Sequence, residues 1–218
     1  MTWAALWPLL WQATLETLWM VVPSALTAQL LGTALGVALT LSRPGGLHPH
    51  APLFRLLDAA VNVGRSLPFI ILLVLLIPFT RLLTGTSIGS TAAIVPLTVA
   101  AIPFVARLVD GALQGVPVGV AEAARAMGAT TAQTVTRVLL PEARPALIQA
   151  FTVMAVSLIG YSAMAGAIGG GGLGDLAIRY GYQRFETGVM TATVLALLLL
   201  VQGVQWAGDR AAARADHR

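Results

Sequence analysis

The sequence predicts an all-α membrane protein with five transmembrane helices, and three observations carry this prediction. The 218 residues are 57% hydrophobic and only 10% charged, whereas a soluble domain carries about 25% charged residues. The mean hydropathy is +0.82. The charged residues fall between long uncharged runs. Such an excess of apolar surface needs an apolar surrounding, so we expect the lipid bilayer as a partner and no nucleic acid.

The positions of the helices follow from uncharged runs, because about twenty apolar residues cross roughly 30 Å of hydrocarbon. We expect spans over 17–42, 59–80, 82–106 and 187–208, and a further one within 145–174. The second span includes Arg65, whose long side chain can reach the membrane surface. In the first span, Gly32 and Gly36 have the GxxxG spacing that favours close helix packing.

The arginines predict the topology, since cytoplasmic loops are rich in Lys and Arg. All thirteen basic residues are Arg. One side of the membrane receives Arg43, Arg55, Arg65, Arg107, Arg125, Arg137, Arg144, Arg210, Arg214 and Arg218, and the other receives Arg81, Arg179 and Arg184. The N-terminus is therefore expected outside and the C-terminus in the cytoplasm.

This topology divides the chain into three parts. Residues 1–13 are expected to form an outer segment, 14–208 the membrane domain and 209–218 a cytoplasmic tail. The first fifteen residues contain no Lys or Arg. Because a cleavable signal peptide begins with a basic region, we expect the first span to remain as an anchor.

Several kinds of chemistry are excluded by composition. A P-loop needs a Lys and the pattern GxxxxGK[ST], and the chain has neither. Without Cys there is no disulfide or thiolate site. His48 and His50 lack a third ligand nearby, so we interpret them as solvated loop residues and expect no metal site. Asp58 and Arg55 are expected to form an ordinary surface pair. No catalytic residue and no cofactor of the chain itself is predicted.

The longest polar interruption, 110–144, contains the most specific motif. Its Ala-rich centre favours a helix up to Gly128, so two short helices with a turn at that glycine are expected. Glu122, Ala123 and Ala124 are followed by Gly128, then after nine residues by Val138 and by Leu140-Pro141. This pattern resembles the EAA-x3-G-x9-I-x-LP loop of type I ATP-binding-cassette (ABC) importer permeases, with Val138 in place of the usual Ile.

The resemblance implies the type I ABC importer permease fold, with a coupling helix that lies in a groove of a separate ATPase. The residues concerned would be Ala121, Glu122, Ala123, Ala124, Arg125, Met127, Gly128, Ala129, Leu140 and Pro141. ATP and Mg would be bound by that partner. The alternative is that the Ala-rich helix packs only on its own protein.

Segments 62–89, 92–109 and 160–182 further resemble the permease subunit of methionine importers. That resemblance implies two copies of the permease, two ATPase subunits and an external binding protein that delivers D- or L-methionine across a bacterial inner membrane. Another small amino acid, a betaine-like cation or a metal chelate remain alternative substrates.

One helix face suggests where the substrate passes. Ser157, Tyr161, Met164 and Ile168 recur at i, i+4, i+7 and i+11, and this face is unlike one that contacts lipid. We expect Ser157, Tyr161 and Met164 to line the translocation path, or alternatively to pack the bundle or its dimer interface.

The glycines at 169, 171 and 174 satisfy GxGxxG, but they follow a membrane helix rather than a strand, so no dinucleotide site is expected. We interpret Gly169–Gly174 as an irregular turn that serves as an outer gate or a connector. The following loop, with Asp175, Arg179, Arg184 and Glu186, is available for a binding protein.

Two rival functions remain. A secondary transporter or channel would place charged groups near span centres to bind a coupling ion. No Asp, Glu, Lys or Arg lies near a predicted span centre, which counts against it. A non-transporting membrane scaffold is disfavoured by the motif in 110–144.

Overall fold

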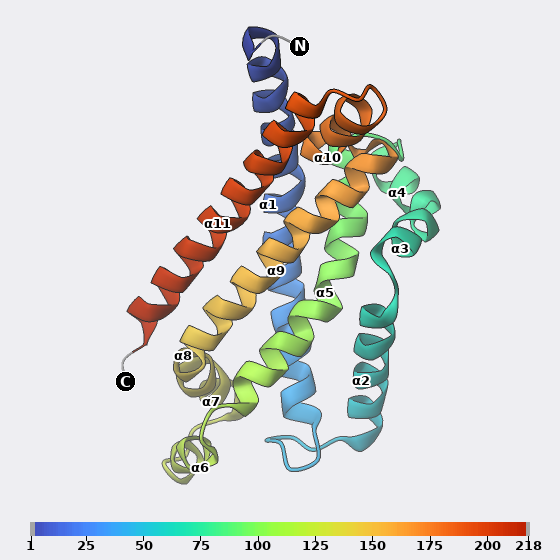
Figure 1. Ribbon diagram of the computed structural model, residues 1–218. Coiled ribbons are helices and arrows are strands. Elements are labelled where there is room, and N and C mark those ends of the chain that lie inside the picture. The colour runs from blue at the N-terminus through green and yellow to red at the C-terminus, as the bar shows by residue number, and fades with distance from the viewer. Residues whose placement is uncertain (1–2, 217–218) are drawn as a thin grey trace.

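The computed structural model describes residues 3–216, which form a helical bundle without strands (Figure 1). Four long helices make up its body: α1 (Trp3–Ser42), α5 (Ser90–Gln114), α9 (Arg144–Ala165) and α11 (Thr187–Ala215). On one side lie α2 (Ala51–Ser66), α3 (Phe69–Leu75) and α4 (Ile77–Thr84).

Short elements occupy the two ends of the bundle. One end carries α6 (Val118–Ala126), α7 (Thr131–Thr134), the π-helix η1 (Val135–Leu139) and α8 (Leu140–Glu142). The other end carries the π-helices η2 (Gly166–Gly170) and η3 (Ala177–Tyr182), with α10 (Gly172–Leu176) between them. The N-terminal end of α1 lies at the same end of the bundle as α10 and projects beyond it, and the C-terminus lies toward α8 (Figure 1).

Among the described residues, four helices are long and apolar enough to cross a membrane. They cover Leu6–Ser42, Ser90–Gln114, Arg144–Gly170 and Thr187–Ala215. A fifth span exists only if α2 and α3, which meet at 103°, count as one. The predicted continuous span over 59–80 is therefore wrong. The break lies at Leu67, which adopts an extended conformation because the following Pro68 disfavours the helical one.

The predicted third span, 82–106, is also displaced. Helix α4 continues to Thr84 and ends at Gly85, whose φ of 75° suits a left-handed cap. Helix α5 begins only at Ser90 and continues past Ala106 to Gln114. The first helix starts at Trp3, so residues 3–13 are the beginning of α1. Likewise, α11 extends through most of the predicted tail to Ala215.

The predicted packing role of Gly32 and Gly36 is confirmed. Helix α1 lies along α5, and a Cβ on Gly32 would come within 2.5 Å of the Val105 Cβ. A Cβ on Gly36 would come within 2.7 Å of the Ala106 carbonyl oxygen. Glycine therefore sets the distance between these two helices.

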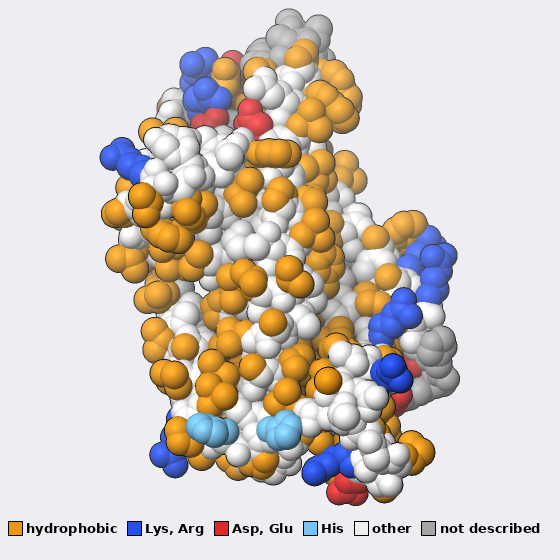
Figure 2. Space-filling view, turned by 180° about the vertical axis from the view of Figure 1, so that it is seen from behind, with side chains coloured by type: hydrophobic (Ala, Val, Ile, Leu, Met, Phe, Trp, Pro, Cys, Tyr) orange, Lys and Arg blue, Asp and Glu red, His pale blue; other side chains and the backbone are white. Residues whose placement is uncertain are grey.

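The core sits where α1, α5 and α9 meet. Met20, Leu97, Met154 and Leu158 are fully buried there. The outer surface is apolar as well: on the face in Figure 2, hydrophobic side chains cover the middle of the bundle, and charged side chains gather toward its ends and along one edge. An apolar core inside an apolar middle surface fits a protein surrounded by lipid.

We predict that Gly36→Ala lowers the free energy of unfolding by about 1–3 kcal/mol, because the added methyl overpacks the α1–α5 contact. Gly203→Ala is the matched control, since a Cβ there meets no atom within 4 Å. Thermal denaturation of the purified chain in detergent measures both. Equal midpoints for the two variants would contradict the packing role of Gly36.

Candidate functional site

The segment with the predicted motif folds as two short helices around a tight turn at Gly128, as expected. Gly128 has a φ of 85°. Its N–H donates to the Arg125 carbonyl at 2.9 Å, and the Ala129 N–H donates to the Ala124 carbonyl at 3.1 Å. These two bonds make a Schellman cap, which needs a residue that tolerates the left-handed conformation.

The motif residues on α6 divide into two faces. Ala124 is only 4% exposed, and Ala121 packs partly buried against the core. Glu122, Ala123 and Arg125 are exposed, and Met127 is 83% exposed. The alternative prediction, that α6 packs on its own protein, therefore holds for Ala121 and Ala124. The opposite face of α6 is exposed.

The second half of the motif anchors the segment. Leu139 is buried in the core, and Leu140 packs against it partly buried. Pro141 is the second residue of α8, which continues from η1. Thr130 begins α7 with a capping box: it accepts a bond from the Gln133 N–H, and the Gln133 side chain accepts one from the Thr130 N–H. Both ends of the segment are therefore fixed.

The two loop histidines are exposed, as expected for solvated residues, and each also has a structural contact. His48 Nε2 lies 2.5 Å from the Thr131 hydroxyl, so the α1–α2 loop contacts α7. His50 Nδ1 accepts a bond from the Leu53 N–H and caps α2. Within residues 3–216, no three His, Asp or Glu side chains lie close enough to hold a metal ion.

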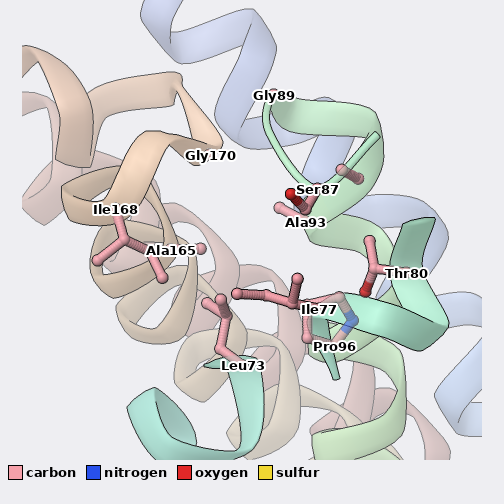
Figure 3. A pocket seen from close by; sticks show the side chains of 11 residues that line it. Leu73, Ile77, Thr80, Ser87, Gly89, Ala93, Pro96, Ala165, Ile168 and Gly170 are labelled. Carbon is pink, nitrogen blue, oxygen red and sulfur yellow. The ribbon is translucent and has the colours of Figure 1, made fainter. Parts of the chain in front are cut away.

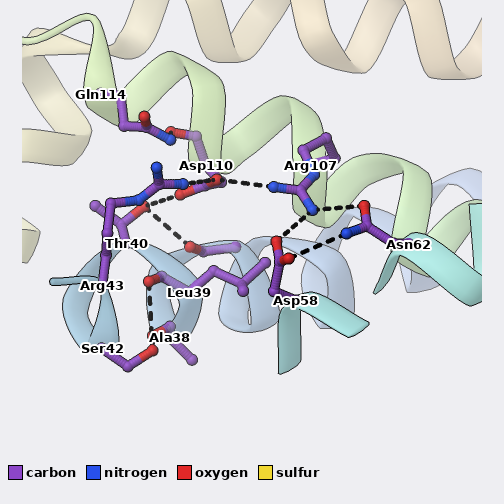
Figure 4. A network of polar contacts seen from close by, with 11 residues as sticks. Ala38, Leu39, Thr40, Ser42, Arg43, Asp58, Asn62, Arg107, Asp110 and Gln114 are labelled. Carbon is purple, nitrogen blue, oxygen red and sulfur yellow. Dashed lines mark hydrogen bonds and ion pairs between the residues drawn. The ribbon is translucent and has the colours of Figure 1, made fainter. Parts of the chain in front are cut away.

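A buried carboxylate joins α5 to the end of α1 at this end of the bundle (Figure 4). Asp110 on α5 is 1% exposed. It accepts hydrogen bonds from the Thr40 hydroxyl at 3.0 Å and from Arg43 at 2.7 Å, both on or just after α1. Arg107 approaches the same carboxylate at 3.5 Å. Two cations and a hydroxyl thus compensate one buried anion.

Arg107 extends this network to α2. Its Nη2 donates to Asp58 at 2.6 Å and to Asn62 at 2.8 Å. The predicted pair between Asp58 and Arg55 is therefore wrong. Arg107 and Asp58 lie 49 residues apart in sequence, and Arg43 and Asp110 lie 67 apart, so no local pattern could have revealed the contacts that join the helices.

Three of the four residues predicted to share a face do so on α9. Tyr161 stacks on Phe69 of α3, with ring centroids 4.7 Å apart and planes 8° from parallel. Ser157 donates its hydroxyl proton to the Val153 carbonyl, and Met164 is about half exposed. Ile168 departs from the face, because η2 loses helical geometry there, with a φ of −115°.

The Gly-rich segment after α9 packs against α1. The Gly172 N–H donates to Glu16 Oε2 at 2.8 Å, and the Leu173 N–H donates to the Thr17 hydroxyl at 2.9 Å. These bonds satisfy the N-terminus of α10. A carboxylate of the chain therefore occupies the place that a phosphate would need, in agreement with the rejection of a dinucleotide site.

The same segment closes one end of the bundle. The Gly89 N–H donates to the Gly169 carbonyl at 2.8 Å, joining the start of α5 to η2. Beneath this bond, Leu73, Ile77, Pro96 and Ala165 line a cavity of only about 20 Å³ (Figure 3). The side chains leave room for little more than one water.

The loop beyond α10 presents aromatic rings. Arg179 forms an ion pair with Asp175 at 2.6 Å, and the guanidinium groups of Arg179 and Arg184 lie over the Tyr180 ring. Phe185 is 85% exposed and has a φ of 56°, a conformation that bulky residues rarely adopt. A large ring held outward in a strained conformation suggests a contact surface.

Comparison with known proteins gives one family over most of the chain. The family described as "Binding-protein-dependent transport system inner membrane component" matches residues 32–216. The probable D-methionine transport system permease protein MetI of Vibrio cholerae is 52% identical over 210 residues, which cover 96% of this chain and 93% of that protein. Its counterpart in Pasteurella multocida is 49% identical over 213 residues, which cover 98% of each chain.

Solved structures give the same result. A chain from the inward-facing conformations of the MetNI methionine ABC transporter is 48% identical, with a TM-score of 0.97 and full coverage of both chains. A chain from an amino acid ABC transporter with histidines is 20% identical, with a TM-score of 0.77 over 95% of this chain and 94% of that one. This second likeness extends to the fold alone.

We predict that Asp110→Ala lowers the free energy of unfolding by roughly 2–3 kcal/mol, because Arg43 and Arg107 lose their shared anion. The effect is below that of a fully buried pair, since both arginines are partly exposed. Asp209→Ala is the control, as Asp209 is exposed and bonded only within its own helix, to Gln205. Denaturation midpoints in detergent compare the two, and an Asp110→Ala midpoint equal to that of the control would contradict the role of the network.

Proposed function

This chain belongs to the binding-protein-dependent transport system inner membrane components, and from that premise we propose that it is the permease subunit of an ATP-driven methionine importer. The observation that carries the proposal is the likeness to the MetNI permease chain, at 48% identity and a TM-score of 0.97 over the full length. The chain is a multi-pass protein of the inner membrane.

The energy source would be a separate ATPase. The chain has no Lys and no P-loop, so ATP and Mg would be bound by two ATP-binding-cassette subunits that serve two copies of this permease. The similar MetNI chain comes from an ABC transporter, which supports such a partner.

We place the ATPase contact on the open face of α6. This face combines Glu122, Ala123 and Arg125 with the exposed side chain of Met127. Small and apolar groups allow close docking, and the two charges can pair with charges on the partner. Ala121, Ala124 and Leu140 pack against the core on the inner side of this segment, and Ala129 bonds the end of α6 through its N–H. Gly128 shapes the turn at its end.

This placement defines the orientation in the membrane. The α6–α8 end, with most of the arginines, would face the cytoplasm together with the C-terminus, and the α10 end would face outward with the N-terminus. The exposed rings of Tyr182 and Phe185 would then be available to an external binding protein.

The transport mechanism would be alternating access. Closure of the ATPase pair would move α6, and the helix cores would rock so that the path opens outward and then inward. We propose Ser157, Tyr161 and Met164 as path residues. Their support is that Tyr161 and Met164 are not fully covered by the chain itself, although they lie on an inner helix.

The proposed function predicts ATP-dependent methionine uptake by vesicles that contain this permease, its ATPase and its binding protein. Uptake should require all three components and stop without ATP. Alanine and glycine betaine serve as comparison solutes. ATP-dependent uptake of either one, with no uptake of methionine, would contradict the substrate assignment while leaving the importer class intact.

The proposed coupling surface predicts that Gly128→Ala weakens the complex with the ATPase about tenfold. Alanine resists the left-handed conformation by about 1–2 kcal/mol, so the turn would open and α6 would lose its docking position. Gly85→Ala is the matched control: it has a φ of 75°, equally open surroundings and a place at the other end of the bundle. Co-purification and ATPase stimulation measure both, and equal losses in the two variants would contradict a specific role of α6.

A further inference from the structure

A second cavity lies at the break between α2 and α3, and it is larger than the cavity beneath η2 and differently lined. Its volume is about 180 Å³. The residues that line it are Gly64, Arg65, Leu67, Phe69, Ala100, Phe104 and Tyr161. They come from α2, the break itself, α3, α5 and α9. The cavity is therefore a product of the tertiary fold.

The break creates the opening. At Gly64, α2 still lies tight against α5, because a Cβ there would come within 2.9 Å of the Pro103 ring. Three residues later the chain becomes extended at Leu67 and turns by 103° into α3. The backbone thus changes direction just beyond this tight contact with α5, and the cavity lies at the bend.

One wall of the cavity carries an unneutralised charge. Arg65 is exposed, and among residues 3–216 it has no hydrogen bond or ion pair within the chain. The nearest acidic residue on its own helix, Asp58, is taken by Arg107, and Asp110 is taken by Arg43 and Arg107. Arg65 therefore lies at the cavity without an acidic side chain of the described residues to neutralise it. A guanidinium in this position is suited to receive a carboxylate through paired hydrogen bonds.

The other walls are aromatic. Phe69 is buried and stacks on Tyr161, while Phe104 contributes a third ring from α5. Rings of this kind contact a thioether favourably, by about 0.3–1.5 kcal/mol. The cavity is smaller than the usual site for a drug-sized ligand, which begins at about 300 Å³, and is scaled to a single small molecule. A cation at one side and rings at the other match the two ends of an apolar amino acid.

We propose that this cavity is a transient binding site for the transported amino acid, in which Arg65 receives the α-carboxylate and Phe69, Phe104 and Tyr161 contact the thioether side chain. The proposal rests on the proposed function and adds a residue, Arg65, to the path residues on α9. Tyr161 belongs to both, because its ring faces the break between α2 and α3. An anionic lipid headgroup shares the chemistry that Arg65 recognises and is distinguished by the experiment.

The test compares Arg65→Gln with Arg55→Gln in vesicles that contain the ATPase and saturating binding protein and methionine. Both variants lose one exposed arginine from α2, but only Arg65 lines the cavity. We expect Arg65→Gln to import roughly tenfold less methionine per ATP hydrolysed, the loss of one charge-assisted contact. Arg55→Gln should match the parent chain, and Arg65→Lys, which keeps the charge, should recover part of the loss.

Two further readouts decide the interpretation. The Arg65→Gln defect should persist in vesicles of phosphatidylcholine alone, whereas its disappearance there would assign Arg65 to an anionic lipid and overturn the proposal. A diazirine analogue of methionine, photolysed with the permease–ATPase complex, should label peptides that contain Arg65 to Phe69 or Tyr161. Labelling that is absent there, or unchanged in Arg65→Gln, would also overturn it.

Failure of this inference is separable from failure of the proposed function. If the parent chain imports methionine and Arg65→Gln imports it equally well, only the binding site is wrong. If the parent chain imports no methionine, the substrate assignment itself is wrong, and the cavity loses its proposed ligand.

Discussion

A single buried carboxylate sets the arrangement at one end of this bundle. Asp110 is almost fully enclosed, so its charge must be compensated by neighbours, and those neighbours come from the ends of α1 and α5. Arg107, held beside it, draws in Asp58 and Asn62 on α2. Three helices are thereby fixed relative to one another at the base of the segment that leads to α6.

This fixed base positions the coupling segment, residues 115–140, which carries α6. The segment leaves α5 at Gln114, only one turn after Asp110, and returns through Leu139 and Leu140 to the same core. The alanines of α6 that face inward let this helix lie close to the base, and the outward face remains free for a partner. The EAA pattern thus combines two requirements, close internal packing and an accessible surface, on opposite sides of one short helix.

The sequence predicts what local patterns encode. Long apolar runs predicted the helical class, GxxxG predicted a close packing face on α1, and Gly128 predicted the turn after α6, because each depends on residues that are near one another in the chain. The partner of the packing face, α5, was not predicted. The break at Leu67 and the late start of α5 were missed, since an uncharged run does not reveal where Pro68 or Gly89 interrupts a helix. The ion pairs Arg43–Asp110 and Arg107–Asp58 and the cap on α10 were missed because their partners are distant in sequence.

Helix α1 makes hydrogen bonds at both ends of the bundle. Near one end its Thr40 bonds Asp110, and near the other its Glu16 and Thr17 cap α10. These contacts are about 36 Å apart along a continuous helix. A tilt of this rod about its middle would displace its two ends in opposite directions. The Gly-rich segment 169–174 and the base of the segment that carries α6 are therefore linked through α1, and neither can shift far unless α1 pivots, bends at Pro23, or loses one of these few hydrogen bonds.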